Sequence, residues 1–290
     1  MENVVTPGEL ILKNAKNLLR RLQMSTRVLA STLAAAAFLA TSAFAQQTYK
    51  APRTSDGKPN ISGVWQAMNT ANWDLRAHAA SQGPVLSLGA EFSVPPGPGV
   101  IDGDGTIPYL PAAAEQQKKN FANRLTLDPE VKCYMGGVPR LTYMPYPFQI
   151  IQSPHTIMIA YEFAGAVRSI KIDKSTEPPA DSWMGWSNGH WEGDTLVVTV
   201  TGLNDQTWFD RAGDFHSDAL KVTERYTPRS ADTLMYEATI EDSKTFSQPW
   251  KISMPLYRHV EKNAQIMEYK CPEFAEEVLY GKYRKQQPAK

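Results

Sequence analysis

Residues 186–201 read WSNGHWEGDTLVVTVT and hold the clearest strand–turn–strand pattern in the chain. Two runs rich in aromatic and β-branched residues, at 186–191 and 195–201, flank the short connection Glu192-Gly193-Asp194. The glycine allows the positive φ angle that a tight hairpin loop often needs. This stretch therefore predicts an antiparallel β-hairpin.

Similar runs continue on both sides of the hairpin. The sequence predicts a first strand near Trp65 and further strands at 148–153, 156–162, 166–172, 220–227, 233–241, 251–256 and 266–271. Regularly spaced strands without intervening helices indicate an antiparallel barrel or sandwich. Sequential hairpins favour a barrel, whose closure removes exposed edges. We predict a mainly β protein with a lipocalin-like up-and-down β-barrel, because about eight to ten strands can enclose one small ligand.

The region before the barrel has a different composition. Residues 83–111 are rich in Pro and Gly, and residues 112–124 read as a helix. We expect a signal peptide with an N-terminal extension at 1–45, an irregular segment that packs on the barrel at 46–144, and the β-barrel domain at 145–290.

The N-terminus indicates export. After Met24 a short basic start precedes an apolar run at 28–40 and the sequence Ala43-Phe44-Ala45. These are the parts of a secretory signal peptide, and the apolar run is shorter than the roughly 20 residues of a membrane span. We expect cleavage after Ala45 and a soluble periplasmic or secreted chain, whose translation starts at Met1 or Met24.

Charge and cysteine content narrow the range of partners. The chain has 30 basic and 30 acidic residues, and the mature part has no basic cluster. We therefore expect neither nucleic acid nor, after signal cleavage, a membrane as partner. Cys133 and Cys271 are the only cysteines. In an oxidising compartment they can form a disulfide or remain two buried thiols, and the oligomeric state stays open.

Glu224 is the most informative acid in the sequence. Alternation along 220–226 places Glu224 on the same face as Leu220, Val222 and Tyr226. A carboxylate that points into a barrel must be paired or protonated. Two roles fit this position. Glu224 is bound by an inward arginine such as Arg168 or by the indole N–H of a tryptophan, or it is a general acid or base with a raised pKa.

Extended backwards, the same alternation places His216 on the face of Glu224. The turn at 212–214 just before it predicts that His216 lies at the barrel mouth, beside a loop that contains Asn204, Asp205 and Asp210. An imidazole titrates near neutral pH, and carboxylates can orient it. We predict that His216 and Glu224 are the catalytic pair of a cofactor-independent lyase, isomerase or hydratase, with Asp205 and Asp210 as further catalytic residues. The alternative is a hydrogen-bonded loop that closes one end of the barrel.

Aromatic residues are abundant along the predicted strands. The predicted ligand-binding residues are Trp183, Trp186, Trp208, Tyr226, Tyr236, Arg168 and Asn204. Pockets with aromatic walls and few polar groups hold flat apolar molecules. We therefore expect a small apolar or aromatic molecule as partner. A non-catalytic carrier or sequestering protein is the alternative function, and a plain aromatic core or an envelope scaffold would need no ligand.

Two local motifs suggest other chemistry. Residues 185–189 read GWSNG and fit the G-x-S-x-G pattern of serine hydrolases. That elbow needs a helix after the serine, whereas a hairpin follows here, so a strand is the preferred interpretation and a serine hydrolase the second alternative. His216 and Asp218, with the distant His259, match a two-His-one-carboxylate iron site. A loop histidine and a solvated aspartate are more common at this spacing, and we assign no metal ligand.

Three longer motifs extend through the mature chain. They are DGKPNISGVW at 56–65, WMGWSNGHWEGDTLVV at 183–198, and NDQTWFDRAGDFHSDALKVTERY at 204–226. With these motifs the chain resembles a widespread family of uncharacterised exported bacterial proteins that is common in proteobacteria. Leu203 stands where that family usually has Phe. The resemblance implies a shared fold and brings no established activity.

Overall fold

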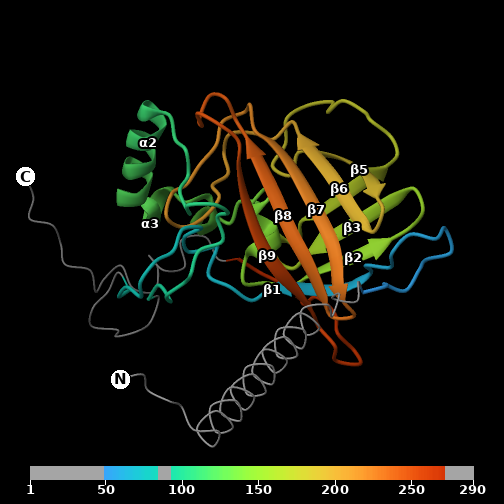
Figure 1. Cartoon of the computed structure of the whole chain (residues 1–290). Helices are drawn as coiled ribbons and strands as arrows, with labels where there is room; N and C mark the ends of the chain where they lie inside the picture. The colour runs from blue at the N-terminus through green and yellow to red at the C-terminus, as the bar shows by residue number, and fades with distance from the viewer. Residues whose placement is uncertain (1–48, 84–92, 272–290) are drawn as a thin grey trace, which may run out of the picture. The chain divides into compact units, whose positions relative to one another are not determined.

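Nine strands, in chain order, close into a β-barrel (Figure 1). The structure is a computed structural model that describes residues 49–83 and 93–271. Each strand pairs with the next, and the last pairs with the first. The strands are β1 Gly63–Ala67, β2 Phe148–Gln152, β3 Thr156–Tyr161, β4 Val167–Ile172, β5 Trp186–Glu192, β6 Thr195–Thr201, β7 Lys221–Ser230, β8 Thr233–Glu241 and β9 Trp250–Arg258.

The mainly β fold and the closed barrel are confirmed, with two differences from the expected strands. β4 and β5 run parallel, because residues 173–185 are long enough to carry the chain back across the sheet. The strands follow one another in chain order, but this parallel pair means that the barrel is not strictly up-and-down. Residues 266–271 do not form the expected strand. β1 already pairs with β9, so the barrel offers this segment no free edge.

A disulfide and aromatic contacts, rather than strand pairing, hold the segment after β9. Cys133 and Cys271 form a disulfide with a Cα–Cα distance of 5.6 Å, which confirms one of the two alternatives for this pair. The ring of Tyr269 packs against Tyr146 and Phe163, with centroid distances of 4.8 and 5.1 Å. The disulfide therefore joins the end of the described chain to the irregular segment that precedes β2.

Short helices cover one end of the barrel (Figure 1). They are α2 Pro111–Ala122, α3 Arg124–Leu127, η2 Pro129–Lys132, α4 Arg140–Tyr143 and η3 Phe163–Gly165. The expected helix at 112–124 is confirmed, although it ends at Ala122 before α3 begins. Asn120 on α2 donates to the carbonyl oxygen of Gly213 at 3.2 Å. Gly213 has φ +85° and a Cβ there would lie 2.8 Å from the Asn120 Cβ, so this contact requires glycine.

The interior of the barrel is filled by side chains. Burial alternates along the strands, so every second residue of β7, β8 and β9 points inward. The largest inward side chains are each at most 2% exposed and come from Trp65, Phe148, Tyr161, Tyr226 and Tyr236. Such packing makes the barrel a hydrophobic core as well as a frame for the loops at its ends.

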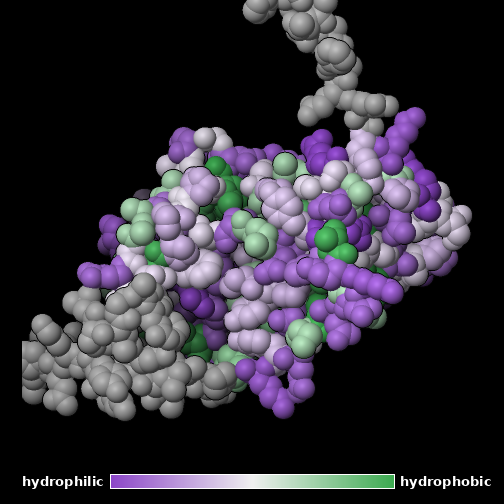
Figure 2. All heavy atoms as spheres, turned by 90° about the horizontal axis from the view of Figure 1, so that it is seen from below, coloured by the Kyte–Doolittle hydropathy of each residue, from purple (hydrophilic) through white to green (hydrophobic). Residues whose placement is uncertain are grey.

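The outer surface mixes polar and apolar residues. Figure 2 shows hydrophilic and hydrophobic side chains interspersed over the face that is seen from below. Within residues 49–83 and 93–271, the helices are too short and too polar to cross a bilayer. The expected signal peptide and its cleavage after Ala45 lie outside the described residues.

Candidate functional site

Glu224 lies inside the barrel in an ion pair with Arg168. Both side chains are almost fully buried, and both guanidinium NH groups of Arg168 donate to the carboxylate. The hydroxyls of Tyr226 and Tyr236 donate to Glu224 Oε1 at 3.0 and 2.9 Å. Arg168 Nε also donates to Ser187 Oγ at 2.8 Å. The inward orientation of Glu224 is confirmed, and Arg168 is the partner that the sequence proposed.

This network fixes the charge state of its members. Burial is the largest single effect and lowers the pKa of Arg168. The Glu224 carboxylate together with the Tyr161 and Tyr226 phenols outweighs burial and holds the Arg168 pKa well above its ordinary value. Burial and the same carboxylate raise the pKa values of Tyr226 and Tyr236, so both phenols stay protonated and act as donors. The carboxylate therefore has a full set of donors within the core.

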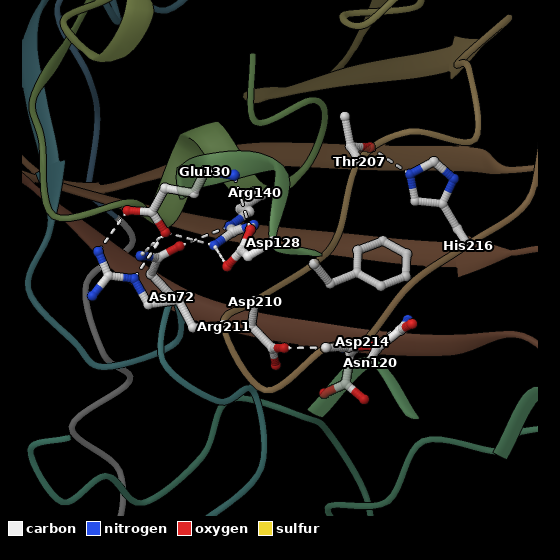
Figure 3. Close-up of polar contacts among 12 residues, drawn as sticks. Asn72, Asn120, Asp128, Glu130, Arg140, Thr207, Asp210, Arg211, Asp214 and His216 are labelled. Atoms are coloured by element: carbon white, nitrogen blue, oxygen red, sulfur yellow. Dashed lines mark hydrogen bonds and ion pairs between the residues drawn. The ribbon is translucent and has the colours of Figure 1, made fainter. Parts of the chain in front are cut away.

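His216 occupies a different network. Its side chain is buried, and Nδ1 lies 2.8 Å from the carbonyl oxygen of Ser217, which can only accept. Nδ1 therefore carries the proton, and Nε2 accepts a hydrogen bond from Thr207 Oγ1 at 2.5 Å (Figure 3). Burial lowers the pKa of His216 below its ordinary value. A neutral imidazole with both nitrogens bonded is the result.

The residues predicted to act with His216 are dispersed. His216 and Glu224 share no hydrogen bond in the described structure, and their action as a catalytic pair stays a prediction. Asp205 is exposed, and Asn204 Oδ1 accepts from the backbone N–H of Gln206 at 3.3 Å. Asp210 is the only predicted acid of this loop that is fully buried. It belongs to a separate cluster of carboxyl groups.

That cluster joins Asp210, Asp214 and Asp74, whose carboxylate oxygens lie within 4.8 Å of one another. Asp210 accepts hydrogen bonds from the backbone N–H groups of Leu75 and Asp214, at 2.9 and 3.2 Å. Asp214 accepts from Arg76 at 2.8 Å. This spacing suits a shared proton or a cation, although the guanidinium and the two backbone donors already bind these oxygens.

Burial, and then the charge of Asp214, raise the pKa of Asp210 well above its ordinary value. Burial also raises the pKa of Asp214, against the opposing charge of Arg76. Two carboxylates this close do not both ionise readily, so the pair favours a state that holds one proton. Asp210 is the acid in the loop whose environment most resembles that of a general acid.

A third network surrounds Arg140, which is 1% exposed (Figure 3). Its guanidinium binds both carboxylate oxygens of Asp128, at 2.8 and 3.0 Å, and Glu130 at 2.7 Å. Glu130 also accepts two hydrogen bonds from Arg211, at 2.8 and 2.6 Å. Asn72 accepts from Arg140 Nε at 2.8 Å. The network ties segments around 72, 130 and 211 into one rigid wall.

This wall borders a cleft of about 340 Å³ that we call the Trp73 cleft. Its lining comes from loops and helices outside the barrel strands: Trp73, Asp74, His78, Ala79, Ser81, Gln82, Gly83, Val94, Phe121, Arg124, Leu125, Asp128, Val131, Arg211 and Ala212. The guanidinium of Arg211 lies 5.5 Å from the centroid of the Trp73 ring. Aromatic and aliphatic walls with a few polar groups are typical of small-molecule sites.

Two polar groups of the Trp73 cleft have unused bonding capacity. His78 Nδ1 lies 2.7 Å from the carbonyl oxygen of Arg76, so Nε2 is an acceptor, and this buried atom has no partner in the described structure. Arg124 lies over the Phe121 ring at 4.2 Å and donates to the Phe121 carbonyl oxygen. Burial lowers the pKa of Arg124, and no described carboxylate forms an ion pair with it.

The ligand-binding residues predicted from sequence lie outside the lining of this cleft. Tyr226, Tyr236 and Arg168 fill the barrel, and Trp208 is buried in its loop. Their role in binding stays a prediction. Trp183 packs on Tyr134 with a centroid distance of 4.9 Å.

Trp186 lies on the outer side of β5 and donates through Nε1 to Thr176 Oγ1 at 2.9 Å. Sequence reasoning missed Trp73, Arg124 and Arg140. The only local signal was the run NWDLR at 72–76, which combines an aromatic ring with charges inside an irregular segment.

The two local motifs are resolved by the same geometry. Residues 186–189 belong to strand β5, and Ser187 is buried with its hydroxyl bound to Arg168, so the strand interpretation is confirmed. His216 lies before β7, Asp218 pairs with Lys244, and His259 follows β9. Because β7 begins at the end of the barrel opposite to that where β9 ends, these residues do not form the iron site that the sequence pattern allows.

No protein-family model matches this chain, and no curated protein matches it.

Proposed function

We propose that this protein binds a small apolar or aromatic molecule, and that the molecule occupies the Trp73 cleft. The observation that carries the proposal is the cleft itself. Its volume of about 340 Å³ lies within the range of pockets that hold small ligands, and it combines Trp73, Phe121 and Leu125 with polar groups.

In this proposal the barrel is a scaffold that resembles a lipocalin in architecture but holds its ligand outside the lumen. The ion pair of Glu224 and Arg168 and the large aromatic side chains already fill the interior. The Arg140 network supports the wall of the cleft, since its members are bonded in fixed orientations. Sites built on such rigid supports lose little entropy when they bind.

We also propose that the protein acts after export, in the periplasm or outside the cell. The Cys133–Cys271 disulfide supports this, because disulfides persist mainly in oxidising compartments. The signal-peptide pattern before Gln46 supports it independently. A protein that is exported and binds an apolar molecule suits carriage or sequestration of that molecule.

Acid–base catalysis is the second candidate function, and one observation favours it. Asp74 lines the Trp73 cleft, and the carboxyl group of Asp210 lies within 4.8 Å of it in the carboxyl cluster. A buried acid of raised pKa behind a ligand site is a common arrangement for proton transfer. Catalysis changes the mass or the bond pattern of the bound molecule during incubation, whereas carriage returns it unchanged.

The test is the binding of a neutral fluorescent aromatic probe, 1-N-phenylnaphthylamine, to the mature protein. Saturable binding should weaken about 5- to 150-fold in Trp73→Leu, because an aromatic wall of this kind contributes about 1 to 3 kcal/mol. Trp186→Leu is the matched control, since Trp186 is a partly exposed tryptophan outside the cleft. Loss of binding in Trp186→Leu with full binding in Trp73→Leu would refute the assignment of the cleft.

A further inference from the structure

We propose that the ligand of the Trp73 cleft is an anion, a carboxylic acid with an aromatic body, and that Arg124 binds its carboxylate. This inference rests on the proposed function and specifies the class of ligand. The charged groups of the cleft wall differ in whether the protein already pairs them.

Three of these charges already have partners within the protein. Asp128 accepts hydrogen bonds from both NH groups of the buried Arg140, at 2.8 and 3.0 Å. Asp74 accepts from Arg76 Nε at 3.1 Å. Arg211 is bound to Glu130 at 2.6 and 2.8 Å. A ligand that approached these groups would compete with short, charge-assisted bonds.

Arg124 differs from the other charged residues of the cleft. Its one hydrogen bond within the described structure runs from NH1 to the carbonyl oxygen of Phe121, at 2.8 Å. That bond and the Phe121 ring beneath the guanidinium hold the side chain in place at the cleft. An arginine has five N–H donors in a planar fork, and a carboxylate matches the fork with two parallel bonds. The remaining donors of Arg124 therefore fit a carboxylate of the ligand.

The rest of the lining fits the body of such an acid. Trp73 and Phe121 offer aromatic faces, while Leu125, Val131 and Val94 add aliphatic surface. Apolar walls lower the local polarity around Arg124, which strengthens an ion pair that forms there. A flat aromatic acid can place its ring against these side chains and its carboxylate at the guanidinium.

The experiment compares two probes of the same shape, 2-naphthoate and its neutral amide 2-naphthamide, by isothermal titration of the mature protein. Wild type should bind the acid more tightly than the amide. Arg124→Gln should weaken binding of 2-naphthoate about 10- to 100-fold and leave 2-naphthamide within about threefold, because hydrogen bonds to charged groups are the stronger ones. Arg124→Lys should recover part of the loss for the acid, since it restores the charge without the fork.

Lys119→Gln is the matched control, because it removes one positive charge from the exposed side of α2, outside the lining of the cleft. It should change neither affinity by more than about twofold. An unchanged affinity for 2-naphthoate in Arg124→Gln overturns the inference. Equal weakening of acid and amide without recovery in Arg124→Lys also overturns it. Failure of both probes to bind wild type, or binding that Trp73→Leu does not weaken, counts against the proposed function itself.

Discussion

Replacement of Glu224 by glutamine tests the structural role that we assign to the interior ion pair. The carboxylate accepts hydrogen bonds from both NH groups of Arg168, from Tyr226 and from Tyr236, all inside a filled core. Glutamine keeps the shape but leaves the Arg168 charge buried without a counter-charge. Breaking a buried pair in this way costs about 3 to 5 kcal/mol. Total stability of a domain is about 5 to 15 kcal/mol, so the loss is large.

The assay is urea unfolding followed by tryptophan fluorescence, with the disulfide intact. For Glu224→Gln the midpoint should fall by about 1 to 5 M, given slopes of about 1 to 3 kcal/mol per molar urea. Glu237→Gln is the control on the outer side of β8, where Glu237 pairs with Lys251 at 2.9 Å and remains partly exposed. Its effect should stay below about 1 kcal/mol.

A double variant separates charge from packing. Substitution of both Arg168 and Glu224 by methionine removes the two charges together and keeps the core apolar. This variant should be more stable than Glu224→Gln, because replacement of a whole buried ion pair is often neutral. A loss below about 1 kcal/mol in Glu224→Gln would refute the reasoning, since it would mean that Arg168 finds water or another partner inside the barrel.

Two further predictions concern the wall of the Trp73 cleft. Burial alone would raise the pKa of Glu130, but Arg211 and Arg140 outweigh burial and lower it to about 2. The unfolded value is about 4.3, so this group contributes roughly 3 kcal/mol above pH 5 that is lost as the pH falls toward 2. The stability difference between wild type and Glu130→Gln should narrow over that range in urea titrations, and a constant difference would contradict the ion pairs. Gly213→Ala should lower the melting temperature more than Gly103→Ala, because both have positive φ but only Gly213 has atoms within 4 Å of the added methyl group. Equal shifts would show that α2 does not pack closely there.

Local patterns in the sequence were sufficient to predict most of the barrel. The β-branched composition of 195–201 and the alternation along 233–241 predicted strands with those bounds. The parity of Glu224 predicted its inward direction, and Arg168 was among the partners proposed for it. The parallel pair β4–β5 was missed because neighbouring runs were assumed to form hairpins. The run at 266–271 has strand composition, yet a closed barrel leaves it nothing to pair with.

The cleft was beyond local patterns for a physical reason. Its supporting contacts join residues that are distant in the chain, as when Arg211 binds Glu130 across 81 positions and Arg140 binds Asn72 across 68. Irregular segments have no period that reports which side chains face each other. The sequence did predict Asp210 as a catalytic residue of its loop. Its neighbours Asp214 and Asp74 could not be identified in the same way, because Asp74 is distant in the chain and meets them only in the fold.

The most direct test of the account is a crystal structure of the mature protein with 2-naphthoate. We predict density for the ring between Trp73 and Phe121, with the carboxylate at the guanidinium of Arg124 and the Arg168–Glu224 pair intact. Density for the ligand inside the barrel, beside Glu224, would contradict the claim that the barrel is a scaffold and the Trp73 cleft is the binding site.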